Sequence, residues 1–464
     1  MLVASVIACA YFMQWFDSTV ILTALPQMAK SFGSSPADLS LAVTSYILST
    51  AVFIPVSGWV ADRFGTRNVF RAAIVVFTLA SIGCGFSNSI VELTIARLVQ
   101  GIGASMMVPV GRLILLRTFD KSQLVTMTAF VSVPALIGPI MAPPIGGFIT
   151  TYFSWRWVFF LNIPMGLAGI VAVSLVIKNL KEENPRPFDW LGFLLTGAAL
   201  CSFMYVLELV GHGAAGGVGW HVVGLLVLVA VVAGTWGFMH QKRHPTPLID
   251  LTLFKIPTFR VANDGGSLFR IGVGASMFLQ PVLLQVGFGM SAFSSGLTTF
   301  AGALGLLIMQ PITRPLLKAF GFRSILVWNG LLSAMAIGIG CFFNTTTPIV
   351  AMFLYFLVCG LTRSLQFTGL GTLTVADLDG PNMSTGSSLA SVLQQILPGV
   401  GVALAAMFLQ VLQAMNGPGV EVGARDIQIV LGTAAAIVAL SVPLYLRLPR
   451  DAGATVSGHK PRKV

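Results

Sequence analysis

Gly58-Trp59-Val60-Ala61-Asp62-Arg63-Phe64-Gly65-Thr66-Arg67 is a short polar turn between two long apolar runs, in a chain with little charge elsewhere. Because lipid leaves backbone polar groups no partner outside the segment, we expect both runs to be helices and the turn to join them as a hairpin. Gly58 and Gly65 are expected to let neighbouring helices approach closely. Asp62 is expected to bond backbone or a helix N-terminus across the turn, and Arg63 and Arg67 to lie at the headgroups. The plainer alternative is a basic anchor loop of any polytopic protein.

The composition places the whole chain in a membrane. Of its 464 residues, 55% are hydrophobic and 9% are charged, and the mean hydropathy is +0.87, which excludes a water-soluble globular domain. The net charge of +11 is spread over short loops, which argues against nucleic-acid binding. We expect neither disulfides nor metal ligands among the five cysteines, because all of them lie in apolar runs without paired spacing: Cys9, Cys84, Cys201, Cys341 and Cys359. No cofactor is expected. The first apolar run carries Asp17 and Pro26 and lacks a basic leader, so it is expected to be a retained helix.

The apolar runs predict an all-α polytopic protein with fourteen membrane spans, since a helix needs about 20 apolar residues to cross the hydrocarbon. The expected cores are 4 to 25, 39 to 61, 69 to 87, 91 to 115, 124 to 150, 156 to 177, 190 to 210, 219 to 239, 261 to 286, 292 to 316, 323 to 342, 347 to 368, 385 to 412 and 427 to 446. With the N-terminus inside, twenty of the 27 Lys and Arg residues fall on the cytoplasmic side and three on the outside. This bias predicts that both termini are cytoplasmic.

An internal repeat predicts two related halves. Lys318-Ala319-Phe320-Gly321-Phe322-Arg323 repeats the Phe, Gly and Arg spacing of the 62–67 segment, 256 residues further on. Both copies lie between the second and third spans of a six-span block if two central spans are an insertion. The expected domains are an N-terminal six-helix half (1–178), a linker with two additional helices (179–258), a C-terminal six-helix half (259–447) and a cytoplasmic tail (448–464).

Asp17 is the first candidate for chemistry, because it is a lone carboxyl within a long apolar run. At this depth no solvent stabilises its charge, which favours the protonated form. Arg97 begins the run Arg97-Leu98-Val99-Gln100-Gly101-Ile102-Gly103-Ala104 and is expected about 9 Å below the outer surface, close to the depth of about 12 Å expected for Asp17. A cation there favours the charged carboxylate, and the two influences together suit a proton-binding site. A purely structural hydrogen bond of Asp17 is the alternative.

A helix rich in proline and glycine follows at Gly138-Pro139-Ile140-Met141-Ala142-Pro143-Pro144-Ile145-Gly146-Gly147. The small residues allow tight packing and the prolines free backbone carbonyls, so the sequence predicts a bent helix that seals against its neighbours. Ordinary helix packing explains the pattern about as well as a gate does.

These motifs resemble four signatures of the fourteen-span drug:proton antiporter branch (EmrB/QacA-type) of the major facilitator superfamily, over nearly the whole chain. The runs 43–67 and 97–112 look especially like the MdtD type of bacterial exporters. The resemblance implies a major facilitator fold with two extra helices, Asp17 as the protonation site, Arg97 as its partner, and a conformational latch at Gly58, Asp62, Arg63, Gly65 and Arg67. It also implies an antiporter helix with Gly138, Pro139, Pro143, Gly146 and Gly147. Ala142 stands where the family usually has glycine, which makes the gate assignment less secure.

Several polar and aromatic residues are expected near a substrate cavity: Phe16, Tyr46, Arg112, Arg270, Gln280, Gln285, Arg363 and Gln366. Arginines outnumber acids within the spans, which favours an anionic or chelate substrate. The alternative is that Arg112 and Arg363 only extend toward the interface or hold helix ends.

The resemblance implies a proton-coupled secondary transporter that exports drugs or other small amphipathic compounds by alternating access. The alternatives are an exporter of small organic anions or metal chelates such as citrate-like compounds and, more remotely, a non-transporting membrane sensor. An enzyme is not expected, because no HExxH motif, Ser/His pair or paired aspartates occur at membrane depth. The expected partners are a small-molecule substrate, protons and the lipid bilayer, with no nucleic acid, and the protein is expected to be a monomer in the inner membrane of a bacterial cell.

Overall fold

The computed structural model describes residues 1–36, 38–119, 121–181, 188–216, 220–244, 251–378, 380–416, 422–449 and 451–454. All regular secondary structure in the described part is helical, and no strand occurs there. Twelve of its helical segments are long and apolar enough to cross a membrane. This all-α architecture agrees with the prediction from the apolar runs, because a helix satisfies its own backbone hydrogen bonds in lipid.

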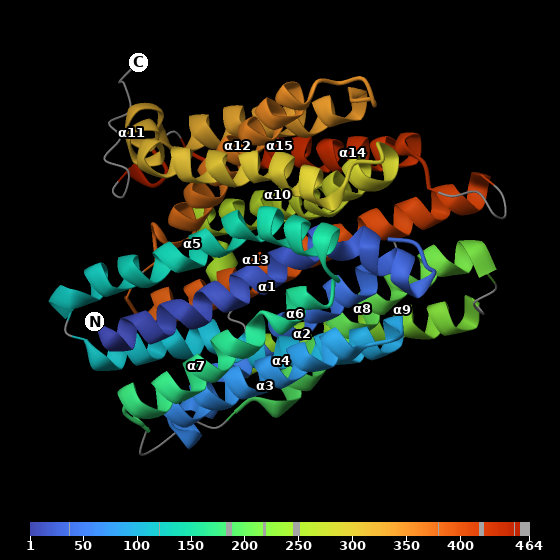
Figure 1. The fold of residues 1–464 in the computed structure, drawn as a ribbon. Helices are drawn as coiled ribbons and strands as arrows, with labels where there is room; N and C mark the ends of the chain where they lie inside the picture. Colours follow the sequence, from blue (N-terminus) through green and yellow to red (C-terminus); the bar gives the residue numbers. More distant parts are fainter. Residues whose placement is uncertain are drawn as a thin grey trace. The chain divides into compact units, whose positions relative to one another are not determined.

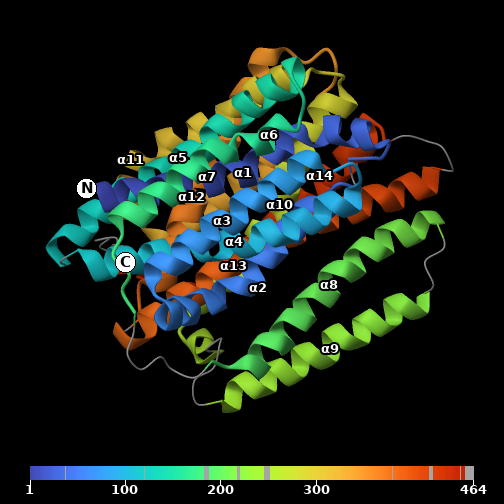
Figure 2. The ribbon, with the colours of Figure 1, turned by 60° about the horizontal axis from the view of Figure 1, so that its bottom comes forward.

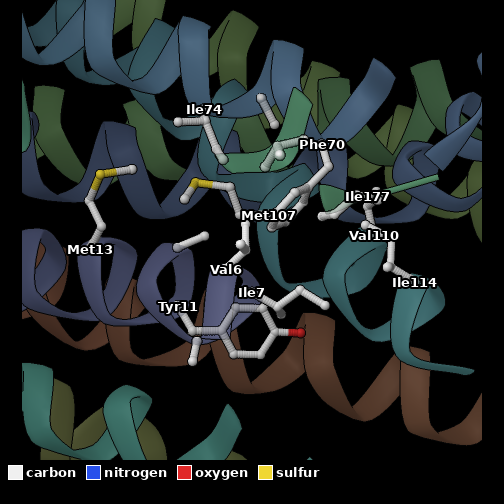
Figure 3. Close-up of a cluster of buried hydrophobic side chains, with 14 of the residues drawn as sticks. Val6, Ile7, Tyr11, Met13, Phe70, Ile74, Met107, Val110, Ile114 and Ile177 are labelled. Atoms are coloured by element: carbon white, nitrogen blue, oxygen red, sulfur yellow. The ribbon is translucent and has the colours of Figure 1, made fainter. Parts of the chain in front are cut away.

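The first of two compact units comprises Met1–Phe193 together with Met290–Leu297. Its helices are α1 (Leu2–Phe32), α2 (Ser40–Phe64), α3 (Thr66–Phe86), α4 (Ile90–Thr118), α5 (Lys121–Tyr152), α6 (Trp157–Phe160) and α7 (Asn162–Val176). α1 packs along α5, and α4 packs against α2 and α3 (Figure 1). Figure 3 shows the apolar core of this unit, in which Ile7, Phe70 and Met107 are completely buried.

The second unit comprises Leu194–Gly289 and Thr298–Val464. The remaining elements, which include the first residues of α8 and α11 from the first unit, are α8 (Trp190–Gly216), α9 (Trp220–Arg243), η1 (Leu251–Lys255), α10 (Pro257–Val282), η2 (Leu283–Gly287), α11 (Ala292–Ile339), η3 (Gly340–Phe342), α12 (Ile349–Val375), α13 (Gly380–Asn416), α14 (Ala424–Ala439) and α15 (Val442–Tyr445). α10 contacts α12, α13, α14 and α15. α8 and α9 lie side by side as a hairpin (Figure 2), in which Gln241 donates a hydrogen bond to the Thr196 hydroxyl over 3.1 Å. The domain boundaries drawn from the sequence remain a prediction.

The repeat noticed in the sequence has a matching backbone. Gly65 joins α2 to α3 with φ 89° and ψ 142°, and Gly321 interrupts α11 with φ 73° and ψ 163°. Both glycines therefore hold a conformation with positive φ that other L-residues rarely adopt. The two expected spans 292–316 and 323–342 accordingly lie in α11, on either side of this break.

The number of fourteen spans stays a prediction. The twelve apolar segments count α11 once, as Ala292–Phe342, and do not include α5. α5 occupies the expected span 124–150 and remains one helix of 32 residues although it contains Pro134, Pro139, Pro143 and Pro144.

Candidate functional site

A buried ion pair lies at the centre of the first unit. The Asp17 side chain of α1 and the Arg97 side chain of α4 are both at most 1% exposed. Arg97 Nη1 donates a hydrogen bond to Asp17 Oδ2 over 2.7 Å. The two residues that the sequence places at similar depth are thus in direct contact.

Two amide side chains complete the surroundings of the Asp17 carboxyl group. Gln100 Nε2 donates to Asp17 Oδ1 over 3.0 Å, and Asn162 Nδ2 donates to the same oxygen over 2.8 Å. Asn162 Nδ2 also lies 2.9 Å from Ser81 Oγ, whose hydroxyl group donates to the backbone oxygen of Phe159. All of these hydrogen bonds to Asp17 come from N–H donors. This arrangement suits a charged carboxylate, which can only accept hydrogen bonds.

The position of Arg97 depends on α4 and α2. Arg97 and Gln100 are three residues apart and share one face of α4, where Arg97 Nη1 also donates to Gln100 Oε1 over 2.8 Å. The Arg97 guanidinium carbon lies 4.1 Å from the ring centroid of Tyr46 on α2, a cation–π contact. A methyl group added at Gly101 would lie 2.6 Å from the Tyr46 backbone oxygen, so this close approach of α4 to α2 requires glycine. Tyr46, one of the residues expected near a substrate cavity, packs against Arg97.

The proline- and glycine-rich helix α5 lies directly against the Asp17 segment of α1. A methyl group at Gly138 would lie 3.0 Å from the Phe16 backbone nitrogen, and one at Gly146 would lie 2.6 Å from Val20 Cγ2. These two glycines therefore bracket Asp17 along α1 and keep the two helices in close contact. Phe16, another expected cavity residue, is 3% exposed and stacks on Phe12 at this contact.

The C-terminal part of α5 also contacts the first turns of α11, within the same unit. A methyl group at Gly147 would lie 2.5 Å from the Ala292 backbone oxygen, and Gly296 lies against the Pro143 backbone oxygen. The Phe293 backbone N–H donates to Thr151 Oγ1 over 2.9 Å. α5 and α11 therefore pack closely at Pro143, next to Ala142.

The loop at 58–67 differs from expectation in two respects. Asp62 does not bond a helix N-terminus in the described structure; its Oδ1 accepts a hydrogen bond from Arg117 Nη2 at the end of α4, over 2.7 Å. This pairing is possible because the C-terminal end of α4 lies next to the C-terminal end of α2. Gly58 is exposed, and a methyl group there would meet no described atom within 4 Å, so close packing does not explain this glycine. Arg63 lies over the Trp59 ring at 5.5 Å.

Gly65, in contrast, is required by a contact that the sequence did not reveal. A methyl group at Gly65 would collide with the Asn179 side chain, which follows α7. Asn179 Oδ1 accepts a hydrogen bond from the Asn68 backbone N–H over 3.4 Å, and the Leu180 backbone oxygen accepts one from the Thr66 N–H over 2.9 Å. The segment after α7 thereby satisfies N–H groups that the first turn of α3 leaves without an intrahelical partner.

Comparison with known proteins assigns the family. Residues 7–256 match the Major Facilitator Superfamily. The chain is 36% identical to "Putative multidrug resistance protein MdtD" of Salmonella heidelberg (strain SL476), with 96% of this chain and 94% of that protein covered. It is 34% identical to the protein of the same name from Enterobacter sp. (strain 638), with 97% and 95% covered. The chain belongs to the Major Facilitator Superfamily.

Solved structures agree with this fold. The crystal structure of a D-xylose-proton symporter matches with a TM-score of 0.68 at 14% identity, covering 97% of this facilitator and 98% of that chain. A POT family transporter in complex with 5-aminolevulinic acid matches with a TM-score of 0.68 at 16% identity, covering 95% of both chains. At such low identity these matches bear on the fold alone.

The other expected cavity residues of this facilitator are distributed over both units. Arg112 lies on α4 and is exposed. In the second unit Gln280 Nε2 donates to the Tyr355 hydroxyl over 3.1 Å, and Gln366 Oε1 accepts from Asn329 Nδ2 over 2.8 Å. Gln285 is buried in η2. Arg270 is completely buried on α10, and Arg363 lies beside a pocket on α12.

Sequence reasoning about this facilitator missed Asn162, Ser81 and Arg117. Asn162 is the first residue of α7 and is completely buried, although a polar residue at the end of an apolar run is usually solvated. One sequence feature points weakly to Asn162 as a partner of Asp17: it is an amide between apolar residues of a span, close to the depth predicted for Asp17. No feature of the sequence pairs Arg117 with Asp62 before the relative positions of α2 and α4 are known.

Proposed function

We propose that this facilitator is a proton-coupled secondary transporter that exports small amphipathic compounds by alternating access. The observation that carries the proposal is the buried Asp17 carboxylate, which Arg97, Gln100 and Asn162 hold from two other helices. An ionisable group inside a membrane protein marks a proton or ion pathway more often than a structural bond. The printed name of the Salmonella and Enterobacter relatives, a multidrug resistance protein, supports drug-like compounds as the substrate class.

Proton binding changes the interactions of Asp17 in a defined way. A protonated Asp17 loses its charge attraction to Arg97 and gains one O–H donor. It then needs an acceptor, and Asn162 Oδ1 is a buried oxygen without a hydrogen-bond partner in the described structure. A rotation of the Asn162 amide would exchange its N–H donor for this oxygen. Protonation would thereby weaken the link between α1 and α4 and favour a second conformation.

The glycine contacts of α5 support its role as the antiporter helix. Gly138 and Gly146 hold it against α1 on either side of Asp17, while Pro143 and Gly147 meet the beginning of α11. In the proposed cycle, a change in the position of α1 after protonation would be transmitted to α5 through these contacts, because tightly packed helices move together rather than deform.

The Gly58–Arg67 loop is the proposed conformational latch. The Asp62–Arg117 ion pair joins the ends of α2 and α4, and both side chains remain partly exposed. An exposed ion pair contributes little to stability, about 0 to 1 kcal/mol, so it is suited to break and form again within a cycle. Arg67 lies in the first turn of α3, next to the α2–α3 joint, and we include its charge in the proposed latch.

The proposed location is the inner membrane of a bacterial cell, with both termini in the cytoplasm. The distribution of Lys and Arg residues over the short loops supports this orientation. Of the tail at 448–464, residues 450 and 455–464 lie outside the described residues.

The direct test is substrate-driven proton movement in proteoliposomes, with Asp17→Asn as the principal variant. We expect Asp17→Asn to lose uphill export driven by a pH gradient, while it still exchanges substrate across the membrane, because Asn cannot carry the proton. Uphill export at the wild-type rate would refute proton coupling through Asp17.

Two controls separate coupling from folding. Asp17→Asn leaves Arg97 as a buried charge without its counterion, which costs about 3 to 5 kcal/mol in comparable proteins. The double variant Asp17→Asn/Arg97→Gln removes both charges, and we expect it to fold better than the single variant yet remain uncoupled. Asp264→Asn is the matched control, because Asp264 is a partly exposed acid about two turns into α10 that pairs with Arg260; it should export normally.

A further inference from the structure

A groove lies on the first unit between α2 and α3, with α4 beneath it. Its volume is about 420 Å³, within the range of sites that hold small molecules. The residues that line it are apolar except Asn68, and all come from three segments long and apolar enough to cross a membrane. The groove exists because α2 and α3 both pack along α4 and contact each other much less. Its wall on α3, from Asn68 to Val76, extends about 12 Å along the helix axis.

The groove opens away from the apolar core of the unit. On α3, Phe70 and Ile74 belong to the core shown in Figure 3 and are at most 1% exposed. Asn68 and Ala72 are each two residues from Phe70, which places them on the opposite face of α3, and Ala72 is exposed. The groove residue Phe64 of α2 is 56% exposed. In a bilayer, exposed apolar surface on a membrane span is covered by lipid chains.

Arg71 is a charged residue within this lipid-facing surface. It follows Thr66, the first residue of α3, by five positions, or about 8 Å along the helix axis. Its side chain is exposed and forms no hydrogen bond or ion pair with any residue that the structure describes. A charge within a span is costly unless it finds a partner, and a long side chain can reach the lipid headgroups to find one. A lipid phosphate would supply the partner that the described protein does not.

Further positive charge gathers at the same end of the groove. Arg67 lies one turn before Arg71 on α3, and its Nε is a buried donor without a hydrogen-bond partner in the described structure. Lys178 and Lys181 are exposed and flank the segment that binds the first turn of α3. The carboxylate of Asp62 at the α2–α3 joint is already paired. The apolar groove therefore ends in a cluster of cations, which is the complement of an anionic amphipathic molecule.

We propose that this groove binds an anionic phospholipid, with an acyl chain between α2 and α3 and the phosphate group at Arg71. Charge complementarity favours this occupant, and basic pockets between membrane helices on the cytoplasmic side are typical sites for anionic headgroups. The α2–α3 joint is predicted to face the cytoplasm, so the headgroup would belong to the inner leaflet. Arg67 and Asn68 supply further N–H donors near the phosphate. This binding goes beyond the proposed export function and does not rest on it.

The test compares phosphatidylglycerol with phosphatidylcholine, both carrying oleoyl chains, so that only the headgroup differs. Binding of each lipid to the purified full-length chain in detergent is measured by native mass spectrometry. We expect phosphatidylglycerol to bind more tightly. Arg71→Gln should weaken its binding by about fivefold, the effect of one arginine beside anionic lipid, and leave phosphatidylcholine binding unchanged. Equal binding of the two lipids by the wild type, or unchanged phosphatidylglycerol affinity in Arg71→Gln, overturns the proposal.

Arg323→Gln is the matched control for charge. Arg323 follows Gly321 by two residues, as Arg67 follows Gly65, so the variant removes one arginine from the corresponding joint of the repeat. It should bind phosphatidylglycerol like the wild type. A loss equal to that of Arg71→Gln would show a general attraction between a basic protein and anionic lipid, and would overturn a specific site. Because Arg71 has no partner among the described residues, we expect Arg71→Gln to unfold at the wild-type temperature.

A second pair of variants tests the apolar part of the site. Ala72→Phe places a ring in the groove, whereas Leu79→Phe places one on the same face of α3 beyond the residues that line it. Both positions are exposed, so both variants should fold. We expect Ala72→Phe to weaken phosphatidylglycerol binding by about tenfold, because several methylene groups of the chain lose their contacts, and Leu79→Phe to have no effect. Undiminished binding by Ala72→Phe would remove the chain from the groove and overturn the proposal. Displacement of the lipid by inorganic phosphate would do the same, since the site would then recognise a free anion.

The lipid proposal and the export proposal fail in different ways. Asp17→Asn should bind phosphatidylglycerol as tightly as the wild type although it no longer couples export to protons. Proton-coupled export by a chain that binds both lipids equally would leave the transporter in place and overturn the lipid site. Selective binding of phosphatidylglycerol by a chain that moves no protons would sustain the lipid site and count against export.

Discussion

Asn162 has a different role at each stage of proton binding to Asp17. Its Nδ2 group donates to the carboxylate over 2.8 Å, while its Oδ1 atom has no partner in the described structure. An amide can present either face to a neighbour, whereas an alcohol or an apolar residue cannot offer both a planar donor and a planar acceptor. Asn162 is thus a positioning residue for the proton: it stabilises the charged state directly and accepts from the protonated state after rotation.

Asn162→Ala should therefore shift the pH dependence of export. The variant loses a donor to the charged form and the proposed acceptor for the protonated form. Because a hydrogen bond to a charged group is the stronger of the two, protonation becomes easier, and we expect the midpoint of export rate against pH to move to higher pH by up to about one unit. The rate is measured in proteoliposomes over a range of internal pH. Asn329→Ala is the control, because Asn329 is also a buried amide in a span but bonds Gln366 and the Thr362 backbone oxygen in the second unit. An unchanged midpoint, or one at lower pH, would contradict this role.

Only part of the Asp17 network could be predicted from the sequence. Asp17 and Arg97 could be predicted because charge within an apolar run is conspicuous, and counting 1.5 Å per residue gave them similar depths. Asn162, Ser81 and Tyr46 could not be assigned to the same network, because their side-chain directions depend on how α7, α3 and α2 rotate about their axes. That rotation is set by packing, such as the approach of α4 at Gly101.

At the scale of elements, the α2–α3 joint depends on one glycine and not on the other. Gly65 has a positive φ and lies against Asn179, whereas Gly58 lies within α2 with open space beside it. The sequence motif contains both, and only the structure separates a glycine that the backbone requires from one that the described unit tolerates. The matching conformation at Gly321 shows that the joint belongs to the repeated unit, which the sequence echo 256 residues apart had indicated.

Gly65→Ala and Gly58→Ala should accordingly differ. We expect Gly65→Ala to lower the unfolding temperature and slow export, because alanine in this sparsely populated φ/ψ region costs about 1 to 3 kcal/mol and its methyl group displaces Asn179. Gly58→Ala should be neutral or slightly stabilising, since alanine is the better helix former. Thermal unfolding in detergent and initial export rates test both variants. Greater damage from Gly58→Ala would mean that a partner covers Gly58 in another conformation.

At the scale of the whole molecule, the residues of the Asp17 network all lie in the first unit. The expected cavity residues Arg270 and Arg363 lie in the second unit. The membrane class and the helical architecture followed from composition and apolar run length alone. The partners of the arginines did not follow from composition, because the surplus of arginine in the sequence does not reveal which arginines are paired.

Orientation in the membrane is also a property of the whole chain. We expect green fluorescent protein fused after Val464 to fluoresce in bacterial cells and alkaline phosphatase fused there to be inactive, because both termini are predicted to be cytoplasmic. Alkaline phosphatase fused after Thr346, between η3 and α12, should be active, since that loop is predicted to face outward. The reverse pattern would invert the topology and with it the side on which Asp62 and Arg117 meet.

The Asp17–Arg97 pair also has a consequence for how the protein is made. When the ribosome has delivered α1 alone, a carboxyl group must enter the bilayer without its partner, which costs about 2.5 to 3.5 kcal/mol on insertion scales, and the same holds for Arg97 when α4 follows. Only the meeting of the two helices removes both penalties. Synthesis of the first four helices is therefore expected to end in an early capture step, in which opposite charges draw α4 onto α1 before the second unit has left the ribosome.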